Sequence, residues 1–154
     1  MFFRKKGGNV VSVANGKAVD LSTVSDPAFA SKAMGEGVAI IPSDGKVVAP
    51  INGEITMIFP TNHAFGIKGK DGVEFLIHIG IDTVNLNGNG FSAIASAGQK
   101  VKAGDSIIDV DLGILSSNNV DSTIMFIVTD DNGKAIKTTV NQEVVAGQTE
   151  VISY

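Results

Sequence analysis

The stretch that decides the fold, residues 61–79, reads TNHAFGIKGKDGVEFLIHI. Two apolar segments flank the Lys-Asp-Gly sequence at 70–72, and an Asp-Gly pair between such segments is a strong signal for a β-hairpin. If Asp and Gly form a two-residue loop, Phe65 faces His78 across the pair of strands. His63 then lies two residues from direct opposition to His78, on the same face and close enough for the side chains to meet.

Short apolar segments separated by turn signals recur along the rest of the chain. Eighteen glycines and only 18% charged residues favour tight turns between strands over amphipathic helices. The predicted fold is therefore all-β, a sandwich or a barrel. Further strands are predicted at 38–41, 73–79, 106–110, 123–129 and 150–153. One or two short helical turns are predicted, at 26–30 and at 91–95 with Gly98 as its stop, and 116–119 is predicted to be a surface loop.

Two pairs of segments resemble each other within the chain. Residues 10–18 and 47–55 both read as a strand, an Asn-Gly turn and a second strand. Residues 99–105 and 142–148 share the pattern Gln-x-Val-x-Ala-Gly and read as turns that enter strands. These repeats fit an architecture that contains an internal duplication.

Length and composition limit the organisation and the compartment. The 154 residues suit one domain, which we expect to span 9–154 after a flexible N-terminus at 1–8. No apolar run approaches the ~20 residues that span a bilayer, and the basic start has no signal-peptide core, so we expect a cytoplasmic protein without stable membrane insertion. The basic start fits either a frayed terminus or a contact with an anionic membrane.

Charge and cysteine content exclude several kinds of site. The chain has no cysteine, which excludes disulfides, thiolate metal sites and a cysteine nucleophile. A net charge of −4 argues against a nucleic-acid partner, because phosphate backbones are bound mainly by Lys and Arg. A protein partner with a basic face fits this charge better.

The two histidines, at positions 63 and 78, are the strongest candidates for chemistry. A lone histidine beside Phe75 and Ile77 would normally be a core residue, but the second histidine points to a site. With an ordinary pKa of about 6.5, imidazole is mostly neutral at neutral pH and has a lone pair that can attack phosphorus. A phosphoryl group brings a charge of about −2, and a neighbouring imidazole can supply a hydrogen-bond donor to it.

Residues 72–84, GVEFLIHIGIDTV, resemble the phosphorylation-site signature of glucose-type enzyme IIA, from the bacterial phosphoenolpyruvate-dependent sugar phosphotransferase system. The resemblance extends in order and spacing over 48–53, 61–65, 90–91 and 98–105. It implies an antiparallel barrel-sandwich hybrid with an internal duplication. The chain differs from the family at its short basic start, which gives no reason to expect the membrane-tethering helix of some relatives.

The resemblance also implies roles for individual residues. His78 would be phosphorylated on Nε2, and its tautomer would be fixed by the Gly80 carbonyl. His63 would hydrogen-bond the phosphoryl group and be oriented by the Thr61 hydroxyl. An apolar rim would dock partners between two flanking acidic residues; the rim is Phe29, Met34, Phe59 and Leu76, and the acids are Asp26 and Asp82.

The function implied is that of a phosphoryl carrier without cofactor or metal. It would accept phosphate from the histidine phosphocarrier protein and pass it to a cysteine on the IIB domain of a glucose-type sugar permease. The sequence leaves open the sugar and permease, the oligomeric state, further regulatory partners, and adventitious zinc between His63 and His78.

Three other functions compete with that of a carrier. Residues 88–93 match the letters of a dinucleotide-binding motif, but they lack the βαβ setting that the motif requires. A zinc hydrolase would need a third histidine, or the closer spacing between two histidines that is typical of helical zinc sites. A regulatory binding module that uses the same apolar rim stays open, because family members are known to combine carrying and binding.

Overall fold

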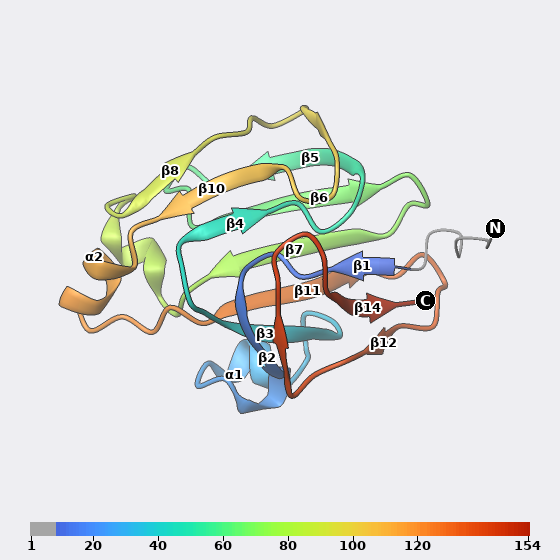
Figure 1. Ribbon diagram of the computed structural model, residues 1–154, viewed down its shortest axis with the longest axis horizontal. Helices are drawn as coiled ribbons and strands as arrows, with labels where there is room; N and C mark the ends of the chain where they lie inside the picture. Colours follow the sequence, from blue (N-terminus) through green and yellow to red (C-terminus); the bar gives the residue numbers. More distant parts are fainter. Residues whose placement is uncertain (1–8) are drawn as a thin grey trace.

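A computed structural model describes residues 9–154, in which short antiparallel strands form one eight-stranded and two three-stranded sheets. The large sheet has the order β13-β2-β3-β11-β7-β6-β5-β9, and the small sheets are β1-β14-β12 and β4-β10-β8. The small sheets lie across one face of the large sheet (Figure 1), which gives the sandwich its two layers. The prediction of an all-β fold is confirmed, whereas the prediction for residues 1–8 lies outside the described part of the chain.

The strands are β1 (Asn9–Val11), β2 (Gly16–Asp20), β3 (Gly37–Pro42), β4 (Lys46–Val48), β5 (Gly53–Ile58), β6 (Ala64–Gly69), β7 (Glu74–Ile79), β8 (Phe91–Ala93), β9 (Lys100–Val101), β10 (Ser106–Val110), β11 (Ile124–Asp130), β12 (Lys137–Thr138), β13 (Gln142–Val144) and β14 (Glu150–Ser153). The helices are η1 (Leu21–Thr23), α1 (Pro27–Ala30), η2 (Thr83–Leu86) and α2 (Leu112–Ser117). Among residues 9–154, no helix has the length and apolar character needed to cross a membrane.

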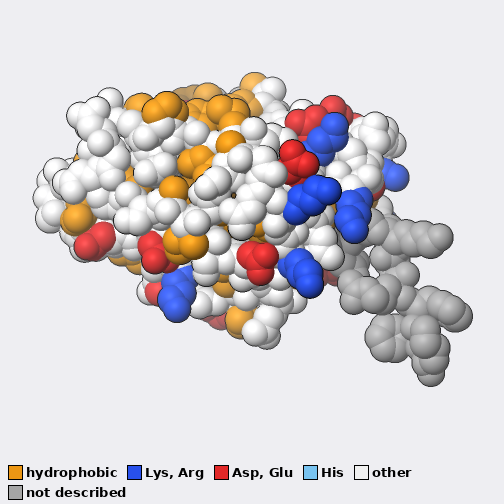
Figure 2. Space-filling model, turned by 90° about the horizontal axis from the view of Figure 1, so that it is seen from above, with side chains coloured by type: hydrophobic (Ala, Val, Ile, Leu, Met, Phe, Trp, Pro, Cys, Tyr) orange, Lys and Arg blue, Asp and Glu red, His pale blue; other side chains and the backbone are white. Residues whose placement is uncertain are grey.

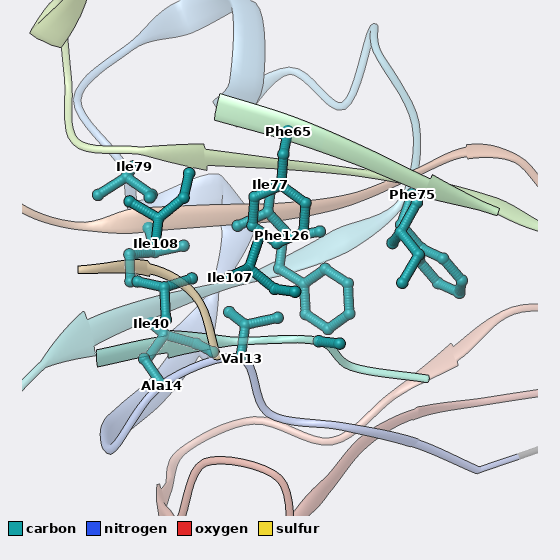
Figure 3. Close-up of a cluster of buried hydrophobic side chains, with 14 of the residues drawn as sticks. Val13, Ala14, Ile40, Phe65, Phe75, Ile77, Ile79, Ile107, Ile108 and Phe126 are labelled. Carbon is teal, nitrogen blue, oxygen red and sulfur yellow. The ribbon is translucent and has the colours of Figure 1, made fainter. Parts of the chain in front are cut away.

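Side chains along β7 point alternately into the core and toward the outer face of the large sheet. Phe75, Ile77 and Ile79 point into the main core, while Leu76 and His78 point outward. The main core lies between the sheets and includes side chains of β6, β10 and β11 (Figure 3). Because successive side chains of a strand point to opposite faces, His78 is held in place by a strand whose inner face is fully packed.

The central strand β11 is buried on both faces. Ile124 and Phe126 belong to the main core, whereas Met125 and Ile127 form a second cluster with Phe29 and Leu21 on the outer face. This second cluster anchors η1 and α1 on the outer face of the sheet, beside His78.

The internal repeats of the sequence reappear as equivalent strand pairings. In one half β1 pairs with β14 and β2 with β13; in the other β4 pairs with β10 and β5 with β9. The two Gly turns are also equivalent, since Gly147 N–H donates to the Ser12 carbonyl and Gly104 N–H to the Ala49 carbonyl. In both repeats, the two strands flanking the Asn-Gly turn pair with other strands and not with each other.

Two local predictions are wrong. Residues 91–95 do not form a helical turn, because Phe91–Ala93 is strand β8 and pairs with Val110–Ile108 of β10. The segment expected to be only a loop at 116–119 begins inside helix α2. That helix starts where the Asp111 carboxylate accepts hydrogen bonds from the amides of Gly113 and Ile114, an N-cap that the apolar pattern alone does not reveal.

The hairpin between β6 and β7 exists, but its register differs by one residue from the prediction. His78 faces Ala64, not Phe65, because the Gly69 N–H donates to the Val73 carbonyl at 3.0 Å and leaves three loop residues, Lys70 to Gly72, between them. Gly72 takes the left-handed conformation (φ +86°) that closes three-residue hairpin loops. The prediction that His63 lies on the same face as His78, two residues from direct opposition, is therefore wrong.

Candidate functional site

His78 is a partly buried side chain on the outer face of β7, between Ala64 of β6 and Met125 of β11. Its Nδ1 lies 2.9 Å from the Gly80 carbonyl oxygen. Because a carbonyl oxygen only accepts hydrogen bonds, Nδ1 carries the proton. In the neutral ring the lone pair is then on Nε2, which is the nitrogen available for nucleophilic attack.

The peptide of Gly80 is held by hydrogen bonds on both sides. The Gly80 N–H donates to the Thr123 carbonyl and the Ile81 N–H to the Asp121 carbonyl, each at 2.9 Å. Gly80 has φ +81°, a conformation that disfavours a side chain. The fully buried Thr83 also donates its hydroxyl to the Ile79 carbonyl at 2.5 Å. This turn holds the carbonyl that accepts the hydrogen bond from His78, and the sequence did not reveal that Thr83 supports it.

His63 precedes β6 and reaches His78 because of a tight turn, not because of strand register. Its own carbonyl accepts the Ile79 N–H at 2.8 Å, and Asn62 before it is left-handed (φ +59°). This turn directs the imidazole toward His78, with ring centroids 4.9 Å apart and the planes 76° apart. The Thr61 hydroxyl shares a hydrogen bond with His63 Nδ1. Thr61, His63, His78 and Gly80 therefore form one connected group.

Burial favours the neutral form of both histidines. Desolvation lowers the pKa of His63, and the neighbouring His78 lowers it further. Desolvation also lowers the pKa of His78, partly offset by the Gly80 hydrogen bond and by the charges of Asp26 and Asp82. Each ring is therefore mainly neutral at neutral pH, as a nucleophile requires.

The two acidic residues flank the histidine pair. Asp26 is the N-cap of α1, where its carboxylate accepts the Ala28 amide at 2.9 Å. Asp82 is exposed in the turn before η2, in the left-handed conformation (φ +57°). Both carboxylates act on His78 through their charge, which places them near its ring.

The apolar residues expected at the rim differ in exposure. Met34 is 40% exposed, and Leu76 and Phe59 are partly buried. Phe59 contacts His63 edge-on at 5.3 Å between centroids. Phe29 is only 6% exposed and lies against His78 at 5.1 Å, so it supports the histidine and does not stand on an exposed rim as expected.

Two exposed apolar residues near the site were missed. Met57 of β5 is 47% exposed and faces Gly66, which in turn faces Leu76 on the outer face. Val84 of η2, 50% exposed, follows the Asp82 turn. Whether a large apolar side chain is exposed depends on the tertiary structure, so the sequence does not show it directly. The position of Val84 within the motif at 72–84 was nevertheless a signal that this residue lies near the site. Across residues 9–154, no group of three His, Asp or Glu side chains is arranged to bind a metal ion.

Comparisons with known proteins agree on one family. Residues 8–134 match the family model "phosphoenolpyruvate-dependent sugar phosphotransferase system, EIIA 1". The chain is 44% identical over 144 residues to the PTS system glucose-specific EIIA component of Bacillus cereus, covering 93% of this chain and 87% of that protein. It is 41% identical over 149 residues to the corresponding component of Staphylococcus epidermidis, covering 96% and 89%. Glucose permease IIA from Mycoplasma capricolum has the same fold, with a TM-score of 0.86, 37% identity and 99% of both chains covered.

Proposed function

This chain belongs to the EIIA 1 family of the phosphoenolpyruvate-dependent sugar phosphotransferase system, and we propose that His78 carries its phosphoryl group. EIIA components are phosphotransfer proteins with a phosphohistidine intermediate, so one histidine must be the acceptor. The hydrogen bond from His78 Nδ1 to the Gly80 carbonyl carries the assignment, because it leaves Nε2 with the lone pair.

In the first transfer, Nε2 of His78 attacks the phosphorus of a phosphohistidine on the donor protein. The bond from that phosphorus to the donor nitrogen breaks, and the donor imidazole keeps the electron pair. A new bond joins phosphorus to His78 Nε2, while the proton stays on Nδ1 and remains hydrogen-bonded to the Gly80 carbonyl. No separate general base is needed, because the attacking ring is already neutral.

His63 is proposed to stabilise the transferred group. If the Thr61 hydroxyl donates to His63 Nδ1, the proton of His63 is on Nε2 and can be donated to a phosphoryl oxygen. A donor that is already in place costs no reorganisation when the charge arrives. Ring centroids 4.9 Å apart put this donor within reach of a group bound to His78.

The proposed partners are the histidine phosphocarrier protein as donor and the IIB domain of a glucose-type sugar permease as acceptor. The names of the relatives, which are glucose-specific, support this choice of sugar. Residues 9–154 are proposed to act as one EIIA domain. A cytoplasmic location is proposed because phosphoenolpyruvate, the phosphate source named by the family, is an intracellular metabolite.

Incubation with the phosphorylated carrier tests the proposal. One acid-labile phosphate per chain is expected, mapped to His78 by phosphopeptide analysis. A stable phosphate on His63 with none on His78 would reverse the two roles, and no phosphate on either would leave only a binding function.

A further inference from the structure

A groove on the outer face of the large sheet gathers positive charge away from the histidine pair. It has a volume of about 600 Å³ and lies over β5, β6 and β9. Four of the chain's twelve Lys and Arg residues line it: Lys68, Lys70, Lys100 and Lys102. Of the sixteen acidic residues only Glu54 does so.

Strand register explains why these charges converge. Glu54 of β5 faces Lys68 of β6 on one side and Lys100 of β9 on the other. Lys70 and Lys102 lie just beyond the ends of β6 and β9 and also line the groove. In Figure 2, most of the visible Lys and Arg side chains lie toward one end of the surface, with Asp and Glu side chains among them.

Glu54 is the one acidic side chain that lines the groove, and it is shared by the four lysines. Across residues 9–154 the one ion pair within 4 Å joins Lys32 to Glu36, so none of the four has a carboxylate at that distance. Like charges held together repel one another, and a cleft lined by one sign of charge concentrates counter-ions. A bound polyanion would relieve this repulsion.

The groove is separate from the phosphoryl site, although both lie on the outer face. Lys68 is four residues along β6 from Ala64, the residue that faces His78, or about 13 Å. None of the residues that line the groove belongs to the group of Thr61, His63, His78 and Gly80.

We propose that this lysine-lined groove binds a phosphate-bearing anion. Lysine ammonium groups bind phosphate oxygens as point charges, and a volume of this size suits a small molecule. The concave shape favours a soluble phosphate ester, while a lipid headgroup offers the same chemistry. The proposal does not depend on which histidine is phosphorylated.

Inorganic pyrophosphate is the first probe, titrated into the ¹⁵N-labelled full chain at low salt. Saturable shifts are expected for the amides of Glu54, Thr56 and Lys68. The ring signals of His63 and His78 should stay unchanged. Absence of saturation in the millimolar range, or shifts centred on the histidines, would overturn the proposal.

Two charge-matched double variants test whether the groove itself is responsible. Lys68→Gln/Lys100→Gln should weaken pyrophosphate binding about tenfold or more, because it removes two of the four charges. Lys17→Gln/Lys137→Gln removes the same charge from exposed positions outside the groove and should bind like the unmodified chain. An equal loss of pyrophosphate binding in both double variants would show only a diffuse electrostatic attraction and would overturn the proposed site.

Vesicles distinguish the two sources of phosphate. A lipid headgroup would be identified as the ligand if the chain sediments with phosphatidylglycerol vesicles but not with phosphatidylcholine vesicles. This sedimentation should be lost in Lys68→Gln/Lys100→Gln. Pyrophosphate binding without vesicle binding would identify a soluble phosphate. Failure of pyrophosphate to bind would overturn the proposal whatever the result with vesicles.

Discussion

At the scale of single residues, one hydrogen bond decides the chemistry of His78. The Gly80 carbonyl accepts the Nδ1 proton at 2.9 Å, so Nε2 is the nucleophile. We expect His78→Ala to abolish phosphate acceptance, since His63 lacks a carbonyl partner of this kind to take over. Phosphopeptide mapping after incubation with the phosphorylated carrier measures this, and phosphate retained on the variant at wild-type stoichiometry would contradict it.

His63→Gln should slow transfer while leaving the fold intact. An amide can donate a hydrogen bond, but it cannot change protonation as the charge moves. Loss of one well-placed donor costs about 10²- to 10³-fold in comparable sites. Rapid-quench measurement of both half-reactions checks the rate, and circular dichroism checks the fold. Wild-type rates in both half-reactions would remove His63 from a direct role.

The lowered pKa values of His63 and His78 predict a pH dependence of stability. Below a pH of about 6.5, the unfolded chain binds protons on these histidines that the folded protein resists. This contribution to stability should therefore be fully present above this pH and be lost progressively as the pH falls below it. Urea unfolding across this range checks the slope, which should be shallower in His78→Gln. An unchanged slope in that variant would contradict the assignment. The pKa values of Asp20 and Asp44 are also lowered, so their contribution to stability is lost only at lower pH, below about 3.8.

At the scale of elements, the turn from β7 into η2 connects fold and site. Thr83→Val keeps the size of the side chain but removes the hydroxyl that donates to the Ile79 carbonyl. We expect a loss of about 1–3 kcal/mol in the free energy of unfolding, because a buried carbonyl loses its partner. Urea unfolding measures this loss.

The same variant should also loosen the Gly80 peptide and weaken the preference of His78 for the Nδ1–H tautomer. ¹⁵N NMR of the imidazole reports the tautomer directly, which a purely structural role would leave unchanged. Thr83→Ser retains the hydroxyl and should restore both tautomer and transfer rate. Identical tautomer ratios in Thr83→Val and the unmodified chain would limit Thr83 to a structural role.

At the scale of the whole molecule, charge around the histidine pair should govern encounter with the carrier. Asp82 is exposed beside His78, and the net charge is −4. Asp82→Lys should lower the association rate and weaken its salt dependence, with smaller effects on folding, because rim charges act mainly on steering.

Stopped-flow transfer from the phosphorylated carrier at two ionic strengths measures this effect. Glu143→Lys makes the same change of charge at an exposed position on β13 and should change the rate much less. An Asp82→Lys variant with unchanged rates at both ionic strengths would place Asp82 outside the docking surface.

The sequence by itself determined the all-β fold, the duplication and the chemical identity of the site. Alternation of apolar residues and the Asp-Gly turn are local signals, and they predicted β3, β7, β10, β11 and β14 and the β6–β7 hairpin. The repeats carry enough local similarity to predict equivalent halves. The motif at 72–84 identified the family because its histidine, glycine and acidic residues occur at a fixed spacing.

Only the tertiary structure decided how the side chains meet. The three-residue loop shifted the β6–β7 register, and the turn at Asn62 directed His63 toward His78. Burial of Phe29 against His78 and the convergence of lysines from β6 and β9 involve residues distant in sequence. Such contacts depend on strand pairing and packing across the whole sheet. Outside a hairpin, a local pattern contains no information about which strands become neighbours.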